Sequence, residues 1–213
     1  EELSGEFLDF PIKIEVSPQA SVTKTIDQSC YPVPNRLTKI NLLDYFLKDE
    51  TFSRVIVFAK TKLAASEIYK FLERRGHGEA RLIHGNKGQN FRINSYKEFQ
   101  EGGVRILVAT DLASRGIDIE GVTHVINFDV PLIYEDYVHR IGRSGRAGHK
   151  GTSITFVSPD DVWHLRKIEK IINSTVPENP LPKEVYLADF LEAEKTSIAR
   201  EIDRQKKIDD PTY

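Results

Sequence analysis

Short apolar segments alternate with amphipathic helical segments from about residue 25 to residue 176, and this alternation most restricts the fold. Apolar runs such as "RVIVFA", "VRILVAT" and "THVINF" are typical of strands buried on both faces. The stretches between them carry apolar residues at helical spacing. Strands connected through helices are parallel, with right-handed crossovers. The pattern therefore predicts an α/β domain over 25–176, with a doubly wound parallel sheet flanked by helices in three layers.

The ends of the helices can also be predicted. Asn35 and Ser158 precede helical stretches and are candidate N-caps, and Gly76 follows the helix over 62–75 as a stop signal. The helix after Asn35 is expected to place one apolar face on the core, formed by Leu37, Ile40, Leu43, Phe46 and Leu47.

The two ends of the chain differ in character from its centre. Residues 1–24 are predicted to be an inter-domain linker or the end of a preceding domain, and 177–213 a charged, partly helical C-terminal extension. Val185, Leu187, Phe190 and Leu191 are expected to dock the start of that extension. The chain begins with Glu1 and contains no methionine, which indicates an excised piece or a processed product.

Composition excludes several classes of protein. The chain has 30 basic and 32 acidic residues, and a net charge of −2 argues against bulk electrostatic binding of nucleic acid but allows a local basic face. The single cysteine, Cys30, permits no intrachain disulfide and no cysteine-based zinc site. No apolar run approaches the roughly 20 residues of a membrane span. A cytoplasmic protein that does not bind membranes is expected.

Polar clusters follow two of the predicted strands. Ligands of parallel α/β sheets bind beyond the carboxyl ends of the strands. After "VRILVAT" comes a loop with hydroxyls, charges and glycine, and after "THVINF" comes "HRIGRSGRAG", which has no acid and favours an anion such as phosphate. By themselves, these clusters could equally be a structural turn with an Arg115–Asp118 pair and a solvated basic face. The chain has no G-x-x-x-x-G-K-[ST] loop, so it lacks that means of holding a nucleotide. No metal site is expected, since His84 has no partner at ligand spacing.

Taken together, the motifs resemble a known family. "VATDLASRGIDI" and "HRIGRSGRAG" resemble motifs V and VI of DEAD-box RNA helicases, and "VIVFAKT" resembles motif IV. "HGNKGQNFRINSYKEFQEG" is similar to the family's HG-x(4)-Q-x-x-R segment. The resemblance covers about residues 25–160, in order, and is strongest to bacterial RhlE-like helicases. It implies a second RecA-like domain, because the phosphate loop and the DEAD acids of the first domain do not occur in this chain.

The resemblance implies that ATP binds in the cleft with an N-terminal RecA-like domain, which would also hold most of the Mg²⁺ coordination. Arg143 and Arg146 would approach the γ-phosphate as catalytic residues, and Asp118 would accept a hydrogen bond from the ribose. His139 would contact the other domain and link ATP to RNA. The isolated chain is therefore expected to be inactive as an ATP hydrolase.

The same resemblance implies sequence-tolerant contacts to the RNA backbone. The residues expected to make them are Thr110, Gly116, Arg92, His84 and Gly85. Coupling between motifs, without contact to substrate, is expected from Arg115, Arg140 and Gln89.

Two other functions remain possible on the sequence. One is a non-enzymatic module that docks RNA or protein. The other is a DNA helicase of the same superfamily, which "SRGIDI" and "HRIGRSGR" favour less. The RNA target, the pathway and protein partners do not follow from the residues.

Overall fold

A parallel sheet forms the centre of the computed structural model, which describes residues 26–86, 88–114, 121–145 and 150–210. The order across this six-stranded sheet is β1-β6-β5-β2-β4-β3, and every neighbouring pair is parallel. The strands are β1 (Ile26–Pro32), β2 (Val55–Phe58), β3 (Ala80–Ile83), β4 (Ile106–Ala109), β5 (His124–Asn127) and β6 (Gly151–Val157). The predicted doubly wound parallel sheet is confirmed.

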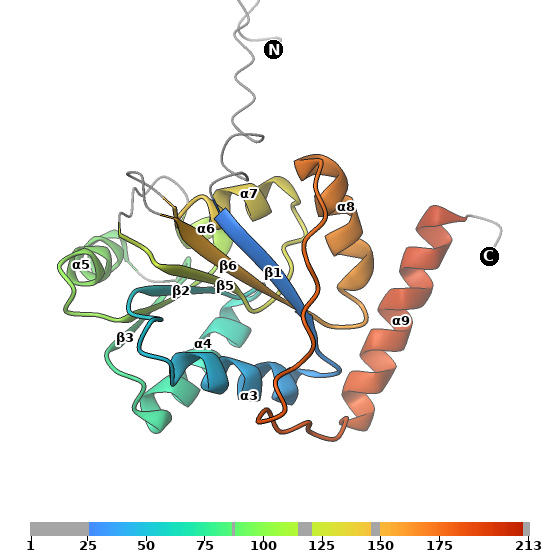
Figure 1. Ribbon diagram of the computed structural model, residues 1–213, viewed down its shortest axis with the longest axis horizontal. Helices are drawn as coiled ribbons and strands as arrows, with labels where there is room; N and C mark the ends of the chain where they lie inside the picture. Colours follow the sequence, from blue (N-terminus) through green and yellow to red (C-terminus); the bar gives the residue numbers. More distant parts are fainter. Residues whose placement is uncertain (1–25, 87, 115–120, 146–149, 211–213) are drawn as a thin grey trace, which may run out of the picture.

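Helices cover both faces of this sheet (Figure 1). One face is covered by α3 (Arg36–Leu47) and α4 (Lys62–Arg75). The other face is covered by α5 (Gln89–Gln100), α7 (Glu135–Ile141) and α8 (Val162–Ile172). A single turn, α6 (Asp111–Ser114), directly follows β4. The three-layer α/β/α arrangement expected from the sequence is confirmed.

Side chains of β2 alternate between two hydrophobic clusters. Val55 and Val57 pack with α3 and α4, whereas Ile56 and Phe58 pack with α5. All four side chains are fully buried. Burial on both faces explains why the strand is a continuous apolar run, because a one-sided strand would alternate with polar residues.

Two of the three predicted helix-end signals are confirmed. The Asn35 side chain accepts a hydrogen bond from the Thr38 N–H (2.8 Å), and Gly76 ends α4 in a left-handed conformation (φ 69°). The prediction for Ser158 is wrong. Asp161 occupies the N-cap position of α8, and the Ser158 hydroxyl donates to its carboxylate (2.6 Å).

The C-terminal extension begins as part of the folded domain. Residues 177–179 lie beside β1, where Cys30 N–H donates to the Pro177 carbonyl and Asn179 N–H donates to the Cys30 carbonyl. Further along, Asn35 Nδ2 donates to the Ala188 carbonyl (2.6 Å). Val185 is buried as expected, but Leu187 and Leu191 are exposed, so neither docks the segment.

The extension ends in an 18-residue helix, α9 (Glu192–Asp209), which lies beside α8 (Figure 1). Its contacts to the domain are mostly polar. The Gln205 amide donates to the Asp160 carbonyl (2.8 Å), and the Trp163 indole donates to Asp209 (2.5 Å). Across the described ranges, no helix combines the length and apolar character needed to cross a membrane.

Candidate functional site

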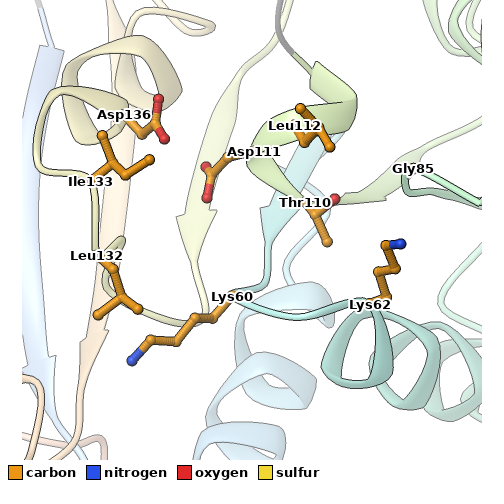
Figure 2. A pocket seen from close by; sticks show the side chains of 9 residues that line it. All are labelled: Lys60, Lys62, Gly85, Thr110, Asp111, Leu112, Leu132, Ile133 and Asp136. Carbon is orange, nitrogen blue, oxygen red and sulfur yellow. The ribbon is translucent and has the colours of Figure 1, made fainter.

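The carboxyl ends of β2 to β5 surround a pocket of about 340 Å³, here called the strand-end pocket (Figure 2). Parallel strands place their following loops at one edge of the sheet, where α/β proteins bind ligands. The lining residues are Lys60, Lys62, Gly85, Thr110, Asp111, Leu112, Leu132, Ile133 and Asp136. Two of the predicted RNA-contacting residues, Gly85 and Thr110, thus lie in one pocket.

One side of the strand-end pocket is suited to an anion. Figure 2 shows the Lys62 ammonium on the Gly85 side, where it donates to Asn86 Oδ1 (2.6 Å). Thr110 lies at the end of β4, and its N–H donates to the Ile83 carbonyl (3.3 Å). An ammonium, a hydroxyl and glycine backbone therefore surround the same space. His84 lies beside this corner, and its Nδ1 accepts from the Asn86 N–H (3.3 Å).

Arg140 joins the loops of the site from beneath. Its guanidinium binds both oxygens of Asp111, with Nε–Oδ1 2.5 Å and Nη2–Oδ2 2.8 Å. Nη1 donates to the Asp129 carbonyl (2.6 Å) and to Asn127 Oδ1 (3.3 Å). The guanidinium also lies over the Phe58 ring, 5.1 Å from its centroid. Its bonds to Asp111 hold α7 to α6. Because the Arg140 side chain is only 1% exposed, it cannot contact a ligand.

Arg92 and Gln89 lie on α5, and Arg92 holds the turn α6. Arg92 Nη1 donates to Gln89 Oε1 (3.0 Å), and Nη2 donates to the Ala113 carbonyl (2.7 Å). The Tyr96 hydroxyl donates to the same carbonyl (2.8 Å), and burial raises the pKa of Tyr96 to about 12, which keeps it a donor. The Arg92 contacts indicate that it positions α6, and its predicted contact with RNA stays a prediction.

The basic cluster begins on α7 and continues past its end. His139 is exposed, and Arg143 follows the helix and donates from Nε to the His139 carbonyl (3.2 Å). Four of the other predicted site residues lie outside the described residues: Arg115, Gly116, Asp118 and Arg146. Through the bond from Arg140 to Asp111, the helix that begins the cluster is held beside the strand-end pocket, at the same edge of the sheet.

Comparison with known proteins decides the family. Residues 38–148 match the family model of the helicase conserved C-terminal domain, which is more than half of the chain. The chain belongs to the helicase C-terminal domain family. RhlB, an ATP-dependent RNA helicase of Shewanella baltica, is 38% identical over 190 residues. That alignment covers 89% of this helicase C-terminal domain chain and 43% of RhlB, so the chain spans less than half the length of that relative.

Solved structures give the same result for this helicase C-terminal domain. The E. coli DEAD-box protein SrmB, in a crystal structure with regulator of ribonuclease activity A, is 35% identical with a TM-score of 0.71, covering 78% of this chain and 98% of that one. S. cerevisiae Dbp5 bound to RNA and ADP BeF3 is 27% identical with a TM-score of 0.76. The match covers 94% of this chain and 51% of that chain. The expected RecA-like domain of the DEAD-box group is confirmed. The narrower RhlE-like assignment stays a prediction, since these relatives have other names.

Sequence reasoning missed the two lysines of the strand-end pocket. Lys60 and Lys62 follow directly after the strand "RVIVFA", in the same position at which the other site loops follow their strands. A search for cations one to four residues beyond each apolar run would have found both. The salt bridge from Arg140 to Asp111 was also missed, because the partners are 29 residues apart with no local pattern linking them.

Proposed function

We propose that the full-length protein is a cytoplasmic, ATP-dependent DEAD-box RNA helicase, and that this chain is its second RecA-like domain. One observation carries the proposal. Buried Arg140 fastens α7, which leads into the arginine cluster, to Asp111 in the wall of the strand-end pocket. The arginine cluster, which suits the phosphates of ATP, is thereby connected to the strand-end pocket, which suits the phosphates of RNA. Coupling of ATP hydrolysis to RNA binding requires such a connection.

For ATP, this domain would supply half of a site. Charge spreads over the phosphoryl oxygens in the transition state, and a guanidinium fork stabilises it there. We assign that role to Arg143 and Arg146, the ribose contact to Asp118, and contact with the N-terminal RecA-like domain to His139. Within the described ranges, no group of three or more His, Cys, Asp or Glu could hold a metal ion. By the family resemblance, we assign Mg²⁺ mainly to the other domain.

For RNA, the strand-end pocket would bind the backbone of one strand. The Lys62 ammonium and the Thr110 hydroxyl suit phosphate and 2′-hydroxyl groups, which carry little sequence information. Because Gly85 has no side chain, the RNA strand could approach the protein backbone in the loop after β3 closely. Such contacts suit an enzyme that remodels many different duplexes.

The proposal is tested by unwinding. The full-length protein should separate short RNA duplexes with ATP, and should fail with a non-hydrolysable ATP analogue. The 213-residue chain alone should neither unwind RNA nor turn over ATP. Equal unwinding of DNA duplexes would support the DNA-helicase alternative. If the full-length protein bound RNA but did not unwind it with ATP, the result would support the non-enzymatic docking module and contradict the proposal.

Gly151, the first residue of β6, provides a sharper test of the arginine cluster. An added Cβ would lie 2.5 Å from Ser144 Oγ and 2.7 Å from the Ser144 carbonyl carbon. These atoms belong to the turn that leads into Arg146, so alanine must displace that turn. We expect Gly151→Ala to lower ATP turnover by about a hundredfold, the effect of misplacing a catalytic group by about 1 Å.

Gly88→Ala is the matched control for this prediction. Gly88 has a negative φ (−58°), and an added Cβ there meets nothing within 4 Å. Its ATP turnover and RNA affinity should equal those of the wild type. Unchanged turnover in Gly151→Ala would show that the turn has no part in hydrolysis.

A further inference from the structure

A second hollow lies between α9 and the loops at the carboxyl edge of the sheet, here called the α9 groove. Its volume is about 650 Å³. The lining residues are Lys60, Asp160, Ala193, Thr196, Ser197, Arg200, Glu201 and Arg204. Except for Lys60 and Asp160, all of them come from one face of α9. The groove therefore depends on where α9 is held.

Polar contacts near both ends fix α9 in place. Near its start, the Glu194 carboxylate accepts from the Arg36 N–H (2.6 Å). Near its end, Gln205 donates to the Asp160 carbonyl, and Asp209 accepts from Trp163 and from Lys167 (3.2 Å). These contacts use residues adjacent to the groove-lining face. The Arg200 side chain, which also lines the groove, takes no part in these contacts.

The cations of the groove are only weakly neutralised. The Arg200 guanidinium makes no hydrogen bond or ion pair with any residue in the described part of the chain. Arg204 is 73% exposed, and Glu201 in its own helix lies 3.6 Å away. Lys60 lies 3.9 Å from Asp161. The two acids of the groove are Asp160 and Glu201, so cations exceed acids by three to two. The Ser197 hydroxyl is a further donor.

The groove continues the strand-end pocket. Lys60 lines both hollows, and Figure 2 shows its ammonium directed away from Lys62. An RNA strand that leaves the strand-end pocket past Lys60 would therefore meet Arg200 and Arg204. These two arginines are four residues apart, hence on the same helix face and about one 5.4 Å turn apart. Guanidinium forks at this spacing suit consecutive backbone phosphates.

We propose that the α9 groove binds the phosphate backbone of the RNA strand as it leaves the strand-end pocket, with Arg200 and Arg204 as the contacts. The inference rests on the proposed function, because it assumes that RNA occupies the strand-end pocket. The C-terminal extension then lengthens the RNA site of the domain. Longer RNAs gain affinity from it, and RNAs confined to the pocket do not.

The test is a double variant, Arg200→Ala with Arg204→Ala, in the full-length protein. Alanine preserves α9 because it has the highest helix propensity. Binding of single-stranded RNAs of increasing length is measured by fluorescence anisotropy, with a non-hydrolysable ATP analogue, over a range of salt concentrations. For long RNA we expect an affinity loss on the order of tenfold at 0.1 M salt. The salt slope should fall by about 1.4, since each phosphate contact on single strands contributes about 0.7.

The control variant is Lys70→Ala with Arg74→Ala. These residues have the same four-residue spacing and the same charge change, but lie in the second half of α4, which runs away from the carboxyl edge. The control should bind RNA of every length like the wild type. The shortest RNA that wild type binds should also be unaffected in the α9 variant.

The outcomes separate this inference from the function on which it depends. Wild type that binds no RNA contradicts the proposed function. Wild type that binds RNA, with an α9 variant equal to it at every length, contradicts only the α9 groove. An equal loss for short and long RNA, or a gain in affinity, also overturns the inference, because α9 would then act through the pocket or obstruct it.

Discussion

Replacing Arg146 with alanine in the full-length protein is expected to lower ATP turnover about a thousandfold while leaving RNA affinity nearly unchanged. Arginines that reach a transferred phosphoryl group across a cleft stabilise charge that develops only in the transition state, and they contribute on the order of a thousandfold or more in rate. Lysine should restore little activity, because an ammonium cannot reproduce the bidentate fork of a guanidinium. The measurement is steady-state ATPase with and without RNA, alongside RNA binding with a non-hydrolysable ATP analogue.

The neighbouring residues sharpen this expectation. Arg143→Ala should behave like Arg146→Ala, and the double variant should cost less than the sum of the single free-energy changes, since both side chains serve one phosphate. His139→Ala should retain basal ATPase but lose stimulation by RNA. If Arg146→Ala kept its ATP turnover and lost RNA binding instead, the arginine cluster would bind RNA. Its assignment to the γ-phosphate of ATP would then be wrong.

The order of elements could be predicted because it depends on local patterns. Strands buried on both faces must be apolar throughout, which made β2 and β4 recognisable, and Asn35 and Gly76 mark helix ends by local hydrogen bonding and backbone geometry. Leu37 shows the limit of this reasoning. It was assigned to the core face of α3, yet it is 55% exposed, whereas Leu42 is fully buried. A periodicity of 3.6 locates an apolar stripe, but tertiary packing decides which of its edges is covered.

The candidate site was predictable where its residues lie in a motif and unpredictable where distant segments meet. Thr110 and Gly85 were found from the resemblance, because each occurs at a fixed place in a motif. Lys39 was not. It is buried at the carboxyl edge, 3.0 Å from Asp161 and 3.3 Å from Asp129. Burial alone would lower the pKa of Lys39, but the two carboxylates raise it above its ordinary value. Nothing in the "RLTKINLL" pattern distinguishes such a lysine from a solvated one.

Arg140→Ala is expected to give a large loss of stability. Arg140→Ala removes both bonds to Asp111, leaves the Asp129 carbonyl without this donor, and opens a cavity over Phe58. Breaking a fully buried ion pair by removing one partner costs about 3–5 kcal/mol, and we expect the low end of this range because the remaining Asp111 side chain is 24% exposed. Native-state hydrogen exchange of the full-length protein should show this loss as a lower opening free energy for the amides of β2 and β5.

Two variants distinguish the network from a general effect of losing an arginine. Arg166→Ala, on the exposed face of α8, should change the opening free energy by less than about 0.5 kcal/mol. Asp111→Ala should also lower the opening free energy, because it leaves the Arg140 guanidinium, which is 1% exposed, without its carboxylate partner. Were Arg140→Ala as stable as Arg166→Ala, the buried guanidinium could not be what fastens α7 to the strand-end pocket. The proposed coupling between the arginine cluster and the strand-end pocket would then have to run through other residues.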